Sequence, residues 1–166
     1  MRYWLTTQWP HTKEVDNPHT PHTDVWLRAG HEDIARELSP GDLVFIYETK
    51  YGKPRADSLG YHEGWQGITD LIKVVEVNTR GFMQSEEEYK DGTSTLWKLV
   101  ARGRLISSGF CPRENVCEVL GYSTNYFFLG YGRRGADGKP SGLGLLTDDQ
   151  YQRLRSCLTR GTQSEP

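Results

Sequence analysis

The sequence predicts an α+β domain built on a curled, barrel-like β-sheet that is flanked by a few short helices. Long runs of β-forming residues, such as 43–48 and 65–77, outnumber the segments that have helical periodicity. Strands and helices also do not alternate strictly along the chain, as they do in a doubly wound parallel sheet. A chain of 166 residues is long enough for one such domain with its own hydrophobic core.

The first 48 residues predict a strand, a loop, a helix and a second strand. Alternating polar and apolar β-formers over 2–6 indicate the first strand. The stretch 10–24 is rich in Pro, His and Thr and indicates a loop. A helix is expected over 31–38, because acidic residues begin it, apolar residues share one face and Pro40 follows it. The apolar run 43–48 predicts a buried strand.

The middle of the chain predicts two more strands between loops. Composition indicates a loop over 51–64, and apolar positions on both faces of 65–77 indicate a long strand. The acidic stretch 85–93 is expected to form a loop that leads into a strand over 96–102.

The last third predicts two helices around one strand. A Pro in the first turn and a Gly after the last delimit a short helix over 112–120. The aromatic run 126–131 predicts a buried strand, and the Gly-rich stretch 133–144 predicts a loop. Thr147 followed by Gln150 forms a capping box that begins the last helix.

Composition and charge exclude several classes of protein. No apolar run is long enough to span a membrane, and the N-terminus lacks the features of a secretion signal, so we expect a cytoplasmic protein. The net charge of −2 excludes nucleic-acid binding by bulk charge. Residues 1–97 carry 10 basic and 16 acidic residues (net −6), whereas 98–160 carry 10 and 5 (net +5), which leaves room for a local phosphate-binding face. We expect one domain over 1–160 and a flexible tail over 161–166.

Motifs of catalysis, cofactor binding and metal binding are missing from the sequence. It has no nucleophile elbow, dinucleotide fingerprint, phosphate loop or zinc-protease motif, so we expect no enzyme activity and no cofactor. The three cysteines lack paired spacing and are expected to be reduced, with Cys117 buried on the apolar side of its helix. Four histidines are expected to be solvated side chains and not metal ligands: His11, His19, His22 and His31.

Three tryptophans stand at junctions between loops and regular elements. Trp9 ends the first strand, Trp26 precedes the first helix and Trp65 opens the long strand. Such junctions ring the openings of barrels, where side chains converge on a ligand. Aromatic rings there sandwich a flat π-system or hold a cation. The alternative is that they plug the end of the barrel, and Trp4 and Trp97 fit packing in the core.

Several segments resemble the PUA-like superfamily and, within it, the EVE domain, with YTH domains more distantly similar. The residues that carry the resemblance are Tyr3-Trp4-Leu5, Gly41-Asp42 through Tyr47, and Gly64 through Val77. The ending GLGLLTDDQYQRL resembles the C-terminal helix of EVE-like modules linked to bacterial restriction systems. Departures from the family pattern at Gln8-Trp9-Pro10 and Trp26-Leu27-Arg28 leave open a ligand that differs from that of the common EVE proteins.

The resemblance implies a reader of modified nucleobases that prefers DNA to RNA. YTH domains hold a methylated adenine in an aromatic cage, and some EVE domains fused to nucleases recognise methylated or hydroxymethylated cytosine. Trp26 matches the position of the cage tryptophan. The residues expected to hold the flipped base are Trp26, Trp65, Tyr47, Tyr61, Trp9 and Asp24. The residues expected to contact phosphates are Arg28, Arg102, Arg104, Arg133, Arg134 and Lys139.

Other functions remain open on the sequence alone. An RNA-binding PUA-like module uses the same fold, and an apolar cage without net positive charge also suits a free nucleoside, in a sensor or a minor hydrolase. In the DNA interpretation the chain is the recognition part of a restriction or defence system. Cleavage then belongs to a separate nuclease chain or a fused nuclease domain, because the sequence has no nuclease motif.

Overall fold

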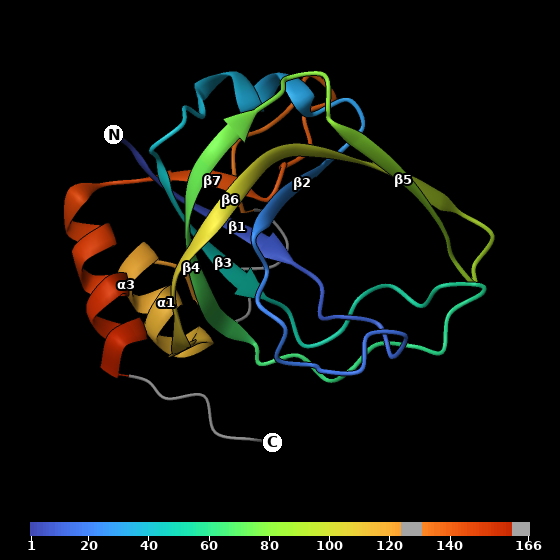
Figure 1. Cartoon of the computed structure of the whole chain (residues 1–166), viewed down its shortest axis with the longest axis horizontal. Helices are drawn as coiled ribbons and strands as arrows, with labels where there is room; N and C mark the ends of the chain where they lie inside the picture. Colours follow the sequence, from blue (N-terminus) through green and yellow to red (C-terminus); the bar gives the residue numbers. More distant parts are fainter. Residues whose placement is uncertain (124–130, 161–166) are drawn as a thin grey trace.

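A curled, mixed β-sheet forms the centre of the computed structural model, which describes residues 1–123 and 131–160 (Figure 1). In chain order the elements are β1 (Tyr3–Gln8), β2 (Asp24–Arg28), the 3-10 helix η1 (Glu32–Glu37), β3 (Leu43–Glu48), β4 (Gly67–Val77), β5 (Met83–Glu88), β6 (Ser94–Pro112), α1 (Arg113–Leu120), β7 (Leu143–Leu146) and α3 (Asp148–Arg160). The strands follow the order β2-β6-β4-β3-β1-β7, and β5 pairs with β6 beside this path. The α+β class with a curled sheet is therefore confirmed.

Both faces of the central strand β3 are buried, which explains its uninterrupted apolar sequence. Phe45 and Tyr47 point into a core shared with α1 and α3, the two helices that lie together at one side of the sheet (Figure 1). Val44 and Ile46 point into a second core on the other face of β3, which contains Trp4 and to which η1 contributes Ala35. The sheet is thus fixed on two sides, and its curl is set by packing.

The strand β6 is 19 residues long and joins the two parts of the sheet. Its first half pairs with β2 on one side and β5 on the other, and its second half pairs with β4. Gly103 lies near the middle, where an added Cβ would come within 2.7 Å of Ile72 Cδ1 and 2.9 Å of the Thr23 carbonyl oxygen. Glycine permits this close approach of backbone to neighbour, so the strand can bend there.

Several predicted elements differ from those observed. Residues 24–28, expected to be the end of a loop and the approach to a helix, form β2, and the helix itself is the short 3-10 helix η1. Residues 85–88 of the expected acidic loop belong to β5, whose side chains are almost all exposed and polar, so it lacks the apolar alternation by which a strand is recognised. The predicted Gly-rich loop overlaps β7. The strand predicted over 126–131 falls mostly outside the described residues, as does the tail over 161–166.

Two predicted helix ends are confirmed, while α1 begins at Arg113 and has Pro112 as its N-cap and not in its first turn. The Thr147 amide donates to Gln150 Oε1 at 2.9 Å, and the Gln150 amide donates to Thr147 Oγ1 at 3.1 Å, which is the reciprocal pattern of a capping box. The helix α1 ends at Gly121 with φ 77°, in the left-handed conformation that glycine adopts readily.

The expectation that all cysteines are reduced is wrong for two of them. Cys111 at the end of β6 and Cys157 in α3 form a disulfide, with Cα atoms 5.3 Å apart. They are separated by 46 positions in sequence, so no local spacing indicates the pair, and it forms because α3 packs on the end of β6. Cys117 is a buried free thiol, as expected.

Within the described part of the chain, neither α-helix has the length and apolar character that crossing a lipid bilayer demands.

Candidate functional site

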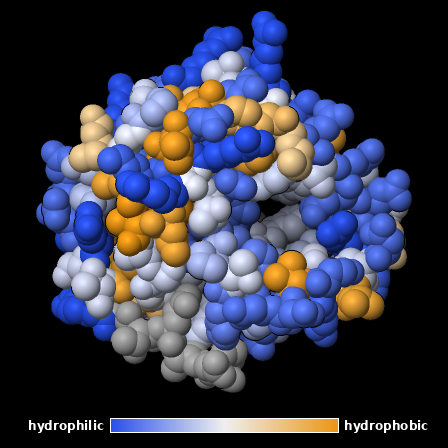
Figure 2. Space-filling view, in the orientation of Figure 1, coloured by the Kyte–Doolittle hydropathy of each residue, from blue (hydrophilic) through white to orange (hydrophobic). Residues whose placement is uncertain are grey.

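A cavity of about 980 Å³ lies between the β2-β6-β5 part of the sheet and the chain segments that follow β1 and β3. The space-filling view is hollowed to the right of its centre, beside the strands β2 and β6 (Figures 1 and 2). Cavities that bind small molecules or cofactors have volumes of roughly 300–1,000 Å³. The volume is therefore sufficient for a flat heterocycle and part of what it is attached to.

Strand pairing places one wall of this cavity. Arg28 of β2 is opposite Trp97 of β6, and Trp97 is opposite Ser85 of β5, so the three side chains share one face of the sheet. Positions two residues away on the same strands face the same way. The side chains of this face that line the cavity are Trp26, Arg28, Ser85, Glu87, Thr95 and Trp97.

Four aromatic rings cluster at the cavity, and Trp9 contacts each of the other three. Its ring centroid lies 5.6 Å from that of Trp97 and 5.9 Å from those of Tyr61 and Tyr89, with all three pairs edge-to-face. Edge-to-face contacts of this kind stabilise aromatic clusters. They also hold the rings in fixed orientations, which favours a site that accepts a planar ligand.

A glycine makes room for this ring cluster. An added Cβ on Gly52 would lie 2.5 Å from Tyr61 Cζ and 2.9 Å from Trp9 Cδ2. Separations this short do not occur between packed carbon atoms, so any side chain at this position would displace both rings.

The charges that line the cavity are mostly positive. Four of the lining residues are basic, and one, Glu87, is acidic. Lys50 is paired with Glu63 at 3.5 Å and Lys53 with Asp91 at 2.9 Å. The four basic residues are Arg28, Lys50, Lys53 and Lys139. A local excess of positive charge around aromatic rings suits a ligand that is both aromatic and anionic.

Glu87 is held firmly in the wall. Its Oε1 accepts a hydrogen bond from Trp97 Nε1 at 2.7 Å and one from the Tyr89 hydroxyl at 3.3 Å. Its Oε2 lies 3.6 Å from Arg55 Nη1, and the side chain is 17% exposed. The carboxylate thus fixes the Trp97 ring and also lines the cavity.

Two lining residues have pKa values moved by their surroundings. Burial raises the pKa of Tyr61 above its ordinary value of 10.0, and the nearby Glu87 charge raises it further, so the phenol stays neutral. Burial lowers the pKa of His11 below 6.5, and the ring of His22 stacked on it at 4.4 Å lowers it further. Both groups therefore favour the uncharged form near neutral pH.

The structure brings together five of the residues predicted to form the site. Trp9, Trp26 and Tyr61 line the cavity from the set expected to hold a base, and Arg28 and Lys139 line it from the set expected to meet phosphates. Arg28 also donates from Nη2 to the Pro140 carbonyl oxygen at 2.9 Å, which joins β2 to the segment before β7.

Three residues expected to hold a base do not line this cavity, in contrast to the expectation that all six would share one site. Tyr47 is fully buried, because β3 is covered on both faces and its odd-numbered side chains face the helices. Trp65 packs against Phe110 and donates from Nε1 to His19 Nδ1 at 3.1 Å. Asp24 begins β2; burial raises its pKa and the Arg102 charge opposes that rise.

Four of the basic residues expected to contact phosphates also lie away from the cavity. Arg102 covers the ring of Phe82 at 4.7 Å, and Arg104 is opposite Lys73 on the outer sheet surface. Arg133 forms an ion pair with Glu37, and Arg134 donates to the carbonyl oxygen of Gly138. Of the six basic residues expected to contact phosphates, Arg28 and Lys139 are therefore the two that line the cavity.

Sequence reasoning missed three lining residues that contribute the most chemistry. Trp97 fitted core packing, while Glu87 and Tyr89 belonged to a stretch that was expected to be a loop. The alternation of Ser85, Glu87 and Tyr89 with exposed charged residues was the available signal for a strand that faces a cavity.

Two histidines expected to be solvated are largely or fully covered by protein instead. His22 has a side chain 9% exposed, and its Nε2 lies 2.7 Å from Glu48 Oε2. His31 is 1% exposed and its Nε2 lies 2.9 Å from Asp137 Oδ1. Among residues 1–123 and 131–160, no group of three His, Cys, Asp or Glu side chains is arranged to hold a metal ion.

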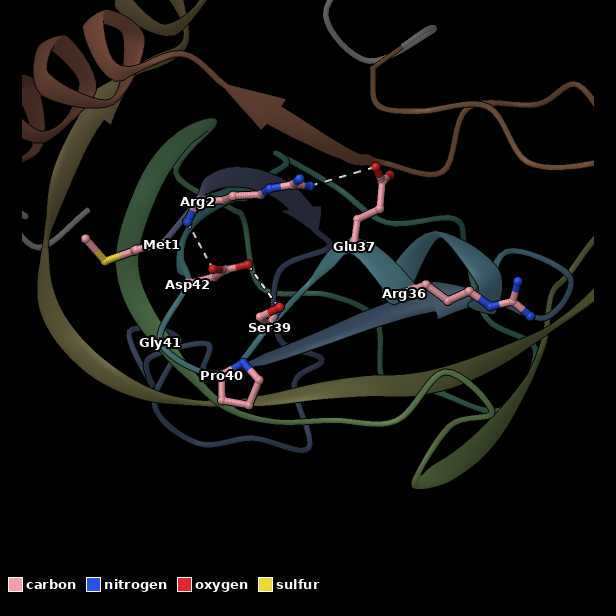
Figure 3. Close-up of a pocket in the computed structure, with 8 residues that line it drawn as sticks. All are labelled: Met1, Arg2, Arg36, Glu37, Ser39, Pro40, Gly41 and Asp42. Carbon is pink, nitrogen blue, oxygen red and sulfur yellow. Dashed lines mark hydrogen bonds and ion pairs between the residues drawn. The ribbon is translucent and has the colours of Figure 1, made fainter.

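A second hollow, of about 480 Å³, lies where the start of β1 meets the turn before β3 (Figure 3). Its buried carboxylate, Asp42, already accepts hydrogen bonds from the Arg2 and Ser39 amides and from Trp4 Nε1. Arg2 is directed toward Glu37, while Arg36 points away (Figure 3). The polar groups of this hollow are therefore occupied by one another, and we assign the functional site to the larger cavity.

Comparison with family models places the chain in a known family. The family model described as EVE domain matches residues 2–105, which is more than half of the chain and contains β1 to β5 and the first part of β6. No curated protein matches the sequence. The match agrees with the curled mixed sheet and the short helices. The chain therefore belongs to the EVE domain family, a PUA-like module of the kind that binds nucleic acids and other ligands.

Proposed function

We propose that this EVE domain is a non-catalytic reader of nucleic acid that holds one modified base, extruded from a DNA duplex, in the aromatic cavity. The observation that carries the proposal is the combination of ring cluster and basic residues around one cavity of about 980 Å³. Aromatic rings recognise the face of a base, and cations at the rim meet the phosphates on either side.

Stacking supplies the free energy that extrusion of a base requires. Taking a base out of a duplex costs a few kcal/mol, and stacking on an aromatic side chain contributes roughly 1–3 kcal/mol per base. Trp26 and Trp97 line the cavity from adjacent strands, and Trp9 lines it from the segment that follows β1. The stacking free energy from two or more rings therefore offsets the free energy of extrusion. Stacking on one ring alone roughly equals that cost.

Recognition of a modification requires that the cavity surrounds the base closely. Burial of one methyl group is worth about 0.8 kcal/mol, a few-fold in affinity. The preference for a methylated or hydroxymethylated base over the plain base is therefore expected to be modest, unless a polar contact adds to it.

In this proposal, cleavage of the DNA belongs to a separate nuclease chain or to a nuclease domain.

The experiment compares duplexes that differ in one modified base. Wild type, Trp97→Ala and Trp65→Ala are titrated with DNA carrying 5-methylcytosine, 5-hydroxymethylcytosine, N6-methyladenine or only plain bases. Trp65→Ala is the matched control, because it removes an indole of similar burial that lies outside the cavity. We expect Trp97→Ala to weaken binding about tenfold or more, from the loss of stacking, and Trp65→Ala to leave it near wild type.

Three results distinguish the alternatives. Equal binding of modified and plain duplexes by wild type contradicts base reading. Tighter binding of a matched RNA duplex places the domain among RNA-binding modules. Thermal stabilisation by a free modified nucleoside, with no binding of duplex, identifies a small-ligand sensor.

A further inference from the structure

Glu87 is the one acidic side chain among the described residues that line the cavity. It is the middle of three consecutive glutamates on β5, and its neighbours Glu86 and Glu88 are exposed. Because successive side chains of a strand point to opposite sides, only the middle carboxylate faces the rings. The sequence therefore places a single hydrogen-bond acceptor of full negative charge beside the stacking surface.

The contacts of Glu87 fix its carboxylate but do not occupy all of its hydrogen-bond acceptor positions. Trp97 Nε1 and the Tyr89 hydroxyl both donate to Oε1, while Oε2 has the Arg55 guanidinium at 3.6 Å. An ionised carboxylate accepts about four hydrogen bonds. The side chain is 17% exposed and borders the cavity, so acceptor capacity remains for a ligand.

We infer that Glu87 accepts a hydrogen bond from the exocyclic amino group of the bound base, which makes the domain selective for cytosine- and adenine-type bases over thymine and uracil. This inference rests on the proposed function of the cavity. A carboxylate can only accept, and the amino groups of cytosine and adenine donate. The O4 atom of thymine or uracil can only accept, so it would face the carboxylate with no hydrogen between them.

The cost of that mismatch is larger than the gain from a methyl group. A base without the amino group forms no hydrogen bond to the charged acceptor and brings the lone pairs of O4 against the carboxylate, and sites built around such bonds reject analogues that lack the donor. Glu87 is tied to Trp97 and Arg55, so it cannot turn away from an unsuitable base without breaking its own contacts. Selection by the amino group thus adds to stacking and methyl burial.

A matched pair of bases isolates this contact. 5-Methylcytosine and thymine share ring size and the methyl group on C5, and differ in the 4-amino or 4-oxo group and in the proton on N3. Stacking and methyl burial are therefore nearly equal for the two. When each is placed opposite an abasic site in the same duplex, neither has a pairing partner to lose.

The test measures the ratio of the two dissociation constants for wild type, Glu87→Gln and Glu86→Gln. We expect wild type to bind the 5-methylcytosine duplex about tenfold more tightly than the thymine duplex, the size of one hydrogen bond to a charged group. Glu87→Gln keeps an acceptor for Trp97 but adds an NH₂ donor that suits O4, so the ratio falls to about twofold or reverses. Glu86→Gln makes the same charge change on the exposed face and should keep the wild-type ratio.

Equal binding of the two duplexes by wild type overturns the inference, as does a Glu87→Gln variant that keeps the wild-type ratio. In both cases a Trp97→Ala variant that weakens binding of both duplexes shows that the proposed function still stands. Wild type that binds neither duplex overturns the proposed function and this inference together. The wild-type comparison needs no variant, so it decides the matter even if Glu87→Gln does not fold.

Discussion

Trp9 and Trp97 meet edge-to-face with ring centroids 5.6 Å apart, although 88 positions separate them in the chain. Trp9 follows β1, and Trp97 lies in the first half of β6. The contact therefore links the two walls of the cavity, and the shape of the site depends on how closely these walls approach.

Gly52→Ala should weaken ligand binding and lower the free energy of unfolding. The added methyl overlaps the Tyr61 and Trp9 rings, and overpacking of this kind costs about 1–3 kcal/mol. Chemical denaturation measures the loss. In a Tyr61→Ala background the same substitution should cost less, because one of the overlapping rings is gone. Equal costs in the two backgrounds would show that the crowding at Tyr61 is not the cause.

Lys139→Ala should weaken binding of a DNA duplex and reduce its dependence on salt. Each phosphate contact that is lost lowers the slope of log affinity against log salt by about 1. Binding measured at several salt concentrations gives this slope. Lys73→Ala is the control, because Lys73 is exposed on β4 outside the cavity. A slope unchanged in Lys139→Ala would remove this lysine from the DNA-binding surface.

Acidification should destabilise the fold partly through His11. Its pKa is lowered from 6.5 in the folded protein by burial and by His22, so the unfolded chain binds the proton more tightly. The stability that the neutral ring contributes is complete above pH 6.5 and is lost as the pH falls toward the folded pKa. Unfolding measured from pH 8 downward should show this loss, and His11→Gln should reduce it. An NMR titration that gives His11 a pKa above 6.5 would contradict the sign.

Reduction of the disulfide should lower the unfolding temperature. The Cys111–Cys157 pair closes a loop with a sequence separation of 46, and a native disulfide typically contributes about 2–4 kcal/mol. Wild type is heated with and without a thiol reductant, next to a Cys157→Ala variant. The reductant should lower the unfolding temperature of wild type and leave the variant unchanged. The free thiol of Cys117 is present in both proteins, so it cannot produce the difference.

The parts of the fold that the sequence predicted are those whose signals are local. β3 and β4 have dense apolar patterns, and the capping box of Thr147 and Gln150 marks the start of α3. β5 and β7 were missed, because one is polar on nearly every side and the other is four residues long with a glycine inside. Both segments are strands because their backbones pair with neighbouring strands, although their side chains lack the pattern of a strand.

The candidate site was harder to predict, because it depends on which distant segments meet. Trp9, Trp26 and Tyr61 lie at junctions or in loops, and their position indicated a ligand site. Tyr47 did not fit, since alternation along a strand buried on both faces does not say which face meets a helix. For Glu87 the sequence offers only its alternation with exposed charged neighbours, and the pairing of β5 with β6 is what brings it to the cavity.

The segment that joins Lys139 to Gly142 forms part of the cavity wall, yet it lies beyond residue 105, where the family match ends. Glu87 and the ring cluster around Trp9 come from inside the matched region, whereas Lys139 and Tyr131 come from outside it. The wall of the cavity is therefore completed by a segment from outside the family match, and under the proposed function one of the four cations near the phosphates comes from that segment.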